Sequence, residues 1–402
     1  MNKFLRNPCN LYFLLWCLNN LNGFLYPEGT ILNKLFLLLI LLISLKEFIH
    51  YFQYERVSEC RFFRGLNLLL LMYTVYGLLV FVTDGMTVYS KLRDPYSSIS
   101  FIQGAWIIIL PIYVCYLYTK RGYLTLELLQ RWMVVFLLVG VSQYYTIQRQ
   151  MLQSLIAQGI NKSDINNGAG YILLSLIPGM LVFKKKLISY LGIGICVVFI
   201  IMSMKRGAII IASLSLLLII GRDLKKSKGK NKLIVFFLVI LGLTCLLQFV
   251  NHMLETSDYF NARIEATLEG DSSNRDIIYK EIWNDFLYDS DPLQWLFGRG
   301  AMSTLKYFNI YAHNDWLEII FCHGIIGIVI FINYWKRLFD TFKSRTLCEP
   351  SRFCLLLIFC IYLTKSFFSM SIIGMPIYST AMLGFALADG FEQCAAHNYF
   401  KL

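Results

Sequence analysis

Residues 31–49 read ILNKLFLLLILLISLKEFI, and between Leu35 and Leu45 the only residue that is not apolar is Ser44. A helix of this length reaches about 28 Å, close to the roughly 30 Å hydrocarbon core of a bilayer. The stretch therefore predicts a membrane-spanning helix. The composition agrees, because 57% of the 402 residues are hydrophobic and 15% are charged, with a mean hydropathy of +0.57. These values exclude a soluble enzyme, since too few polar residues remain to cover a water-facing surface.

About twelve apolar runs approach the roughly 20 residues that a spanning helix needs. They lie at residues 11–26, 31–49, 62–83, 99–119, 126–147, 168–183, 187–203, 207–220, 232–250, 315–335, 353–370 and 375–391. We therefore predict an all-α polytopic membrane protein with about twelve transmembrane helices. The first nine occupy residues 1–250, one long outer loop with a short helix occupies 251–314, and the last three occupy 315–402.

The positive charge of the chain indicates topology and not nucleic-acid binding. The formal net charge is +12, but the 37 Lys and Arg residues are dispersed among the apolar runs. Most of them fall in the loops that share a side with the N-terminus, which is the positive-inside pattern. This predicts that both termini are cytoplasmic and that the loop at 251–314 lies on the outer face.

The outer loop has the pattern of a folded segment. Apolar residues recur at helical spacing and form one stripe: Ile277, Ile278, Tyr279, Ile282, Trp283, Phe286 and Leu287. Ser273 and Asp276 resemble a capping box, so a helix is expected to begin near Asn274. Arg275 would then lie on the first turn, where free backbone N–H groups already favour an anion. A solvated arginine on a surface helix is the alternative reading.

Two further positions carry groups suited to chemistry at the membrane edge. His313 lies at the end of the loop, where an imidazole could exchange a proton near neutral pH, although a lone histidine is more often structural. Lys205 and Arg206 stand together in a short outer turn, where the charge bias disfavours them. They could bind a phosphate, or they could extend toward lipid headgroups. The acids of the outer loops, such as Asp84 and Asp258, are isolated, which predicts a reaction without a metal.

These segments together resemble a family pattern. Residues 312–327, AHNDWLEIIFCHGIIG, resemble the His-Asn-x-x-Leu-Glu … Gly-Ile-x-Gly signature of the O-antigen polymerase and O-antigen ligase superfamily of bacterial envelope proteins. Residues 273–300, SNRDIIYKEIWNDFLYDSDPLQWLFGRG, resemble its arginine-bearing loop helix and Leu-Phe-Gly-x-Gly turn. Residues 203–207, SMKRG, resemble its Ser-x-Ser-Arg-Gly turn, with Lys205 where the pattern often has serine. The first 200 residues match only in being hydrophobic helices.

The resemblance implies a multi-span glycosyltransferase of the GT-C type in the bacterial inner membrane, with its active site on the periplasmic face. The implied substrates are undecaprenyl-diphosphate-linked glycans as donor and acceptor, with a chain-length regulator as a further partner and no cofactor, metal or nucleic acid. Arg206, Arg275 and His313 match the functional positions of the family. Two arginines would stabilise the departing diphosphate, and the histidine would accept the proton of the attacking hydroxyl. The predicted substrate-binding residues are Lys205, Arg299, Asn314, Asp315 and Glu318, with Asp315 or Glu318 orienting His313.

The motifs leave the choice within the superfamily open. We favour a polymerase, which adds a lipid-linked oligosaccharide to another, over a ligase, which transfers finished polymer to the lipid A core. A transporter or flippase of lipid-linked oligosaccharide also has about twelve spans, but such carriers are commonly built from repeats around a midplane site. The loop at 251–314 has no counterpart in the first half of the chain, and this favours an enzyme.

Overall fold

The protein is all-α and polytopic. The computed structural model describes residues 6–26, 29–54, 60–85, 87–88, 96–157, 167–227, 229–256, 265, 275–371 and 374–392. The apolar helices before the loop are α1 (Pro8–Asn20), α2 (Ile31–Tyr54), α3 (Arg61–Asp84), α4 (Ser98–Lys120), α5 (Leu126–Ala157), α6 (Ala169–Met180), α7 (Lys186–Met202), α8 (Arg206–Lys226) and α9 (Lys230–Thr256). Those after it are α14 (Asp315–Lys343), α15 (Glu349–Phe368) and α16 (Ile377–Leu387). Each of the twelve predicted runs overlaps one of these helices.

Seven helices among the described residues are long and apolar enough to cross a membrane. They are α2, α3, α4, α5, α8, α14 and α15, while α6, α7 and α16 are shorter apolar helices. The loop at 251–314 was expected to hold one short helix, and its described part holds three after α9: α11 (Arg275–Tyr288), α12 (Pro292–Phe297) and α13 (Ser303–Phe308). Between α3 and α4, two strands of two residues each, β1 (Thr87–Val88) and β2 (Tyr96–Ser97), pair antiparallel.

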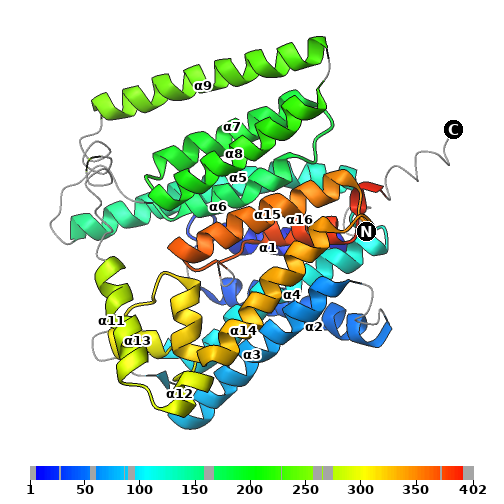
Figure 1. The fold of residues 1–402 in the computed structure, drawn as a ribbon. Coiled ribbons are helices and arrows are strands. Elements are labelled where there is room, and N and C mark those ends of the chain that lie inside the picture. The colour runs from blue at the N-terminus through cyan, green and yellow to red at the C-terminus, as the bar shows by residue number, and fades with distance from the viewer. Residues whose placement is uncertain are drawn as a thin grey trace. The chain divides into compact units, whose positions relative to one another are not determined.

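The chain divides into two compact units. One contains residues Met1–Trp16, Ile31–Leu126 and Ser273–Leu402, and the other contains Cys17–Thr30 and Glu127–Ser272. In the first unit α3 packs on α4 and α14, and α16 packs on α4 and α15 (Figure 1). In the second unit α6, α7 and α8 pack on one another.

The core of the first unit is rich in aromatic rings. Tyr51, Phe63 and Tyr113 are fully or almost fully buried, and the ring of Tyr113 lies 4.7 Å from that of Phe63 and 5.1 Å from that of Tyr51. Gly384 allows α16 to approach α4 closely, because a Cβ there would lie 2.6 Å from the Cβ of Cys115. Aromatic packing and small residues thus hold helices together where lipid removes the usual hydrophobic drive for association.

Helix α14 is broken near its first third. Gly324 has φ 65° and ψ −161°, a conformation that is essentially restricted to glycine. The turn after α12 fills the break, because the N–H groups of Arg299 and Gly300 donate to the carbonyls of Phe321 and Cys322 at 3.0 and 2.9 Å. The Leu-Phe-Gly-x-Gly turn therefore satisfies carbonyls that a continuous helix would have paired internally.

Candidate functional site

The loop helices begin where local sequence signals place them. Helix α11 starts at Arg275, with Asp276 in its first turn, as the capping pattern predicts, while Ser273 and Asn274 lie outside the described residues. Helix α12 starts after a capping box in which the Asp291 side chain accepts from the Gln294 N–H and the Gln294 side chain accepts from the Asp291 N–H. These caps satisfy N–H groups that a helix leaves unpaired at its start.

Helix α11 packs on the first turns of α14 through one face. Ile282 and Phe286 are buried in a cluster with Ala312, Phe321 and Cys322. The predicted apolar stripe is wider than this contact, since Ile277, Trp283 and Leu287 are exposed. The cluster fixes α11 beside the segment that carries His313.

The segments that carry Arg275 and His313 are linked by hydrogen bonds near the last residues of α15. The Arg275 guanidinium donates from Nη1 to the Phe368 carbonyl at 2.7 Å. The Tyr279 hydroxyl, one turn further along α11, donates to the His313 carbonyl at 3.2 Å. The Asn314 side chain donates to the Phe367 carbonyl at 3.4 Å. The structure thus brings together two of the three predicted catalytic positions, and Tyr279 is the residue that joins their segments.

Tyr279 is suited to this bridging role because its hydroxyl stays protonated. Burial raises the pKa of the Tyr279 phenol, although Arg275 and the hydrogen bonds around it act in the opposite direction. A raised pKa keeps the neutral, donating form at neutral pH, so the bond to His313 persists through the physiological range.

The backbone around His313 is held in a specific shape. His313 has φ 51°, in the left-handed region where histidine, asparagine and aspartate are enriched among non-glycine residues. Asn314 follows as the N-cap of α14, and its side chain accepts from the N–H groups of Trp316 and Leu317 at 2.9 and 3.2 Å. The helix therefore begins with Asn314 as its cap.

The two carboxylates that follow are buried and engaged. Asp315 accepts from the backbone N–H of Ser371 at 2.8 Å and from the Ser371 hydroxyl. Glu318 accepts from the Thr304 hydroxyl at 2.6 Å and from the Ala312 N–H at 2.9 Å. Glu318 thereby fixes the position of Ala312, the residue before His313. The proposed roles of Asp315 and Glu318 toward a substrate stay predictions.

Arg299 is enclosed by loop residues of its own unit. Its guanidinium forms an ion pair with Asp285 and donates to the Ser290 hydroxyl at 3.1 Å. It also lies over the rings of Tyr307 and Phe321, at 5.2 and 5.0 Å from their centroids. These contacts join α11 and α13 to α14 around the turn that follows α12. The predicted substrate-binding role of Arg299 stays a prediction.

Lys205 and Arg206 belong to the second unit. Lys205 is the N-cap of α8, and Arg206 is the first residue of that helix. The turn before them is tightly packed: the Ser203 hydroxyl donates to the Ile200 carbonyl at 2.6 Å, and a Cβ on Gly170 would lie 2.2 Å from that hydroxyl oxygen. Arg206 therefore occupies a helix start, the kind of position that favours an anion.

The end of α15 also contributes to the site, which the motifs did not predict. Besides Phe367 and Phe368, Ser366 accepts a hydrogen bond from the Trp316 indole at 2.9 Å, and the rings of Trp316 and Phe367 stack. Lys365 is buried and donates to the Gly374 carbonyl at 3.2 Å. An ionisable residue inside an apolar run was the one available signal, because such residues usually face protein and not lipid.

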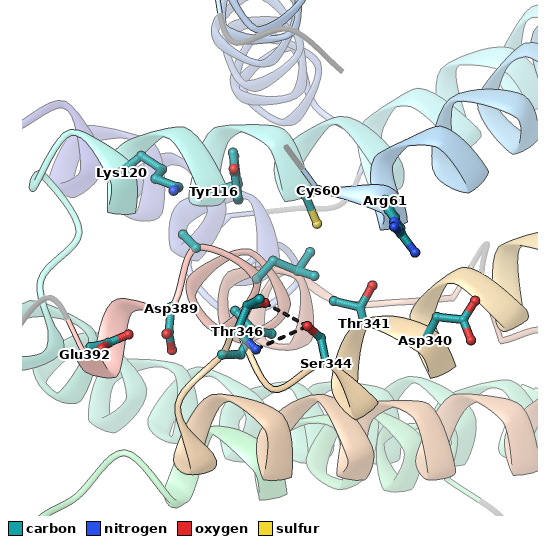
Figure 2. A pocket seen from close by; sticks show the side chains of 13 residues that line it. Cys60, Arg61, Tyr116, Lys120, Asp340, Thr341, Ser344, Thr346, Asp389 and Glu392 are labelled. Carbon is teal, nitrogen blue, oxygen red and sulfur yellow. Dashed lines mark hydrogen bonds between the residues drawn. The ribbon is translucent and has the colours of Figure 1, made fainter. Parts of the chain in front are cut away.

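A cavity of about 780 Å³ lies at the opposite ends of α3 and α14, lined by Arg61 of α3 and Asp340 of α14 among others. Figure 2 shows Lys120 and Tyr116 on one wall and Asp389 and Glu392 on the opposite side. Burial raises the pKa of Asp389, but hydrogen bonds from Cys348 and Ser351 outweigh it and hold that pKa below its usual value. Asp389 stays ionised and caps the start of α15. None of the predicted site residues lines this cavity, so we place the candidate site at the His313 end.

Among the described residues, no group of three or more His, Cys, Asp or Glu side chains could hold a metal ion. The absence of a metal from the reaction remains a prediction.

Comparison with known families agrees with the motifs. Residues 191–332 match a family model described as O-Antigen ligase. This segment contains Arg206, Arg275 and His313, and the match is consistent with the O-antigen polymerase and ligase superfamily. No curated protein matches the chain.

Proposed function

We propose that this multi-pass membrane protein, whose residues 191–332 match a family model described as O-Antigen ligase, is a glycosyltransferase that polymerises undecaprenyl-diphosphate-linked repeat units. The product would be O-antigen or capsular polysaccharide, made at the periplasmic face of the inner membrane. The observation that carries the proposal is that Arg275 and His313, both inside the matched segment, are linked through Tyr279 and through the end of α15, which lies beyond that segment.

The proposed reaction assigns one role to each group. A hydroxyl of the acceptor glycan attacks the anomeric carbon of the donor, and the bond from that carbon to the diphosphate oxygen breaks. His313 takes the proton of the attacking hydroxyl, and undecaprenyl diphosphate leaves with the bonding electrons. Arg275 and Arg206 stabilise the negative charge that grows on the diphosphate, as planar guanidinium groups do well. Lys205, Arg299, Asn314, Asp315 and Glu318 would bind substrate around them.

The contacts in the first unit support these roles. One N–H of Arg275 is held by the Phe368 carbonyl, which fixes the guanidinium plane before a substrate arrives. The left-handed backbone at His313 and the N-cap at Asn314 fix the direction in which the imidazole leaves the chain. Preorganised donors and bases of this kind account for much of enzymatic rate enhancement.

Ligation of finished polymer to the lipid A core is the second candidate, because the matched family model is described by that activity. Deleting the gene separates the two. If the protein is a polymerase, the surface glycan should shorten to single repeat units on the core. If it is a ligase, the core should stay undecorated while lipid-linked polymer accumulates.

A carrier of lipid-linked oligosaccharide makes a different prediction for purified protein. The polymerase should lengthen a lipid-linked repeat unit in detergent, where no second compartment exists. Movement of the lipid-linked unit across vesicle membranes that persists in Arg275→Ala and His313→Ala variants, without any lengthening, would contradict the proposed enzyme.

A further inference from the structure

The segment from α12 to Gly300 is built into the membrane-spanning part of the first unit. Its turn donates two N–H groups to carbonyls of the broken α14. The approach is close on both sides, since a Cβ on Gly298 would lie 2.4 Å from the Cys322 carbonyl carbon, and one on Gly324 would lie 2.5 Å from the Gly298 nitrogen. Both glycines have positive φ. This turn is therefore a part of the helix packing and not a loop lying over it.

Contacts with α3 show how far along the helices this turn lies. The Tyr76 hydroxyl donates to the Phe297 carbonyl at 2.6 Å. Along α3, Tyr76 precedes the terminal residue Asp84 by about 12 Å at 1.5 Å per residue. Asp84 itself pairs with Lys306 of α13 at 2.8 Å, so the charged contact marks the end of α3. The Phe297 carbonyl is bound well inside a helix that is long and apolar enough to span the bilayer.

The side chains that α12 leaves uncovered are apolar. Leu293 is 69% exposed, Trp295 and Leu296 are each 42% exposed, and Phe297 is 48% exposed. The polar Gln294 side chain is turned back onto the Asp291 N–H. The neighbouring helices also expose apolar side chains, including Leu78 and Leu79 of α3 and Ile325 and Val329 of α14.

From this geometry we infer that α12 is a short re-entrant helix whose apolar side chains contact the acyl chains of one leaflet. Irregular backbone at membrane depth is tolerated only where protein satisfies its polar groups, and α14 and Tyr76 do so here. Apolar side chains at that depth continue the lipid-facing surfaces of α3 and α14. A tryptophan is a common residue where a helix meets the membrane interface.

Quenching of tryptophan fluorescence tests the inference. The protein would be placed in nanodiscs with ordinary lipid or with lipid brominated along its acyl chains, and iodide would be added as the aqueous quencher. Subtracting the spectrum of Trp295→Phe from that of the wild type isolates the Trp295 emission. The matched variant is Trp283→Phe, because Trp283 lies on α11 and is also 42% exposed.

We expect brominated lipid to remove most of the Trp295 emission and iodide to leave it largely unchanged. The Trp283 emission, isolated in the same way, shows how strongly each quencher acts on an equally exposed indole of a neighbouring loop helix. Quenching of Trp295 by iodide without quenching by brominated lipid would overturn the inference.

A second pair of variants tests the same surface without relying on Trp295. Leu293→Asp should lower the thermal midpoint in nanodiscs, because a carboxylate would enter the acyl region. Tyr288→Asp, at a residue that is 81% exposed at the end of α11, should leave the midpoint within experimental error. Equal midpoints for the two variants would also overturn the inference.

Discussion

Replacing His313 with alanine is expected to reduce elongation of a lipid-linked repeat unit by about 10²–10⁴-fold, the usual contribution of a positioned general base. Arg275→Ala is expected to reduce it by about 10²–10³-fold, because one preorganised donor to the growing negative charge is lost. Arg275→Lys should restore little, since an ammonium cannot both hold the Phe368 carbonyl and present a planar fork to a diphosphate. The measurement is the initial rate of chain growth by purified protein with saturating donor.

Matched controls separate chemistry from general damage. Arg345→Ala removes an exposed guanidinium from the turn between α14 and α15, and His252→Ala removes an exposed imidazole near the end of α9. Both should elongate at the wild-type rate. If His313→Ala and Arg275→Ala, with unchanged melting behaviour, were as active as these controls, the assigned roles would be wrong.

Replacing Gly324 with alanine is expected to destabilise the protein strongly. The Gly324 backbone lies in a region that costs other residues about 1–3 kcal/mol. The added Cβ would also lie 2.5 Å from the backbone of Gly298 and Leu296, so α12 would have to leave the break in α14. We expect a large fall in the thermal midpoint, or no folded protein, and a similar result for Gly298→Ala.

Gly104→Ala is the control for this prediction. Gly104 lies inside α4, and a Cβ there meets no atom within 4 Å. Alanine in a helix interior is favoured over glycine by about 0.5–1 kcal/mol, so the midpoint should stay constant or rise. Thermal unfolding of Gly324→Ala at the wild-type temperature would show that the turn is not required to fill the break.

The helices could be predicted because an apolar run of spanning length is a local property of the sequence. The run at 31–49 lies within α2, and the run at 315–335 begins where α14 begins. The break at Gly324 could not be predicted, because it depends on the docking of α12, which follows another turn of the chain. The loop also contains α12 and α13, which were not predicted because six residues each are too few to show an apolar repeat at helical spacing.

The candidate site was predictable in its residue types and only partly in its contacts. The motif pointed to Arg275 and His313, but their common anchor, the end of α15, lies more than fifty residues beyond His313 and reads as an ordinary apolar run. The contacts of Arg299 could not be predicted either, because Asp285 and Tyr307 reach it only in the fold. Its substrate-binding role stays a prediction.

Arg206 is proposed to act in the same reaction as Arg275 and His313, since all three match functional positions of the family that the motifs resemble. The elongation assay with purified Arg206→Ala tests this role. We expect its rate of chain growth to fall about 10²–10³-fold, because a donor to the growing negative charge is lost. Wild-type elongation by Arg206→Ala, Arg275→Ala and His313→Ala alike, all with unchanged melting behaviour, would show that none of the three takes part in the reaction.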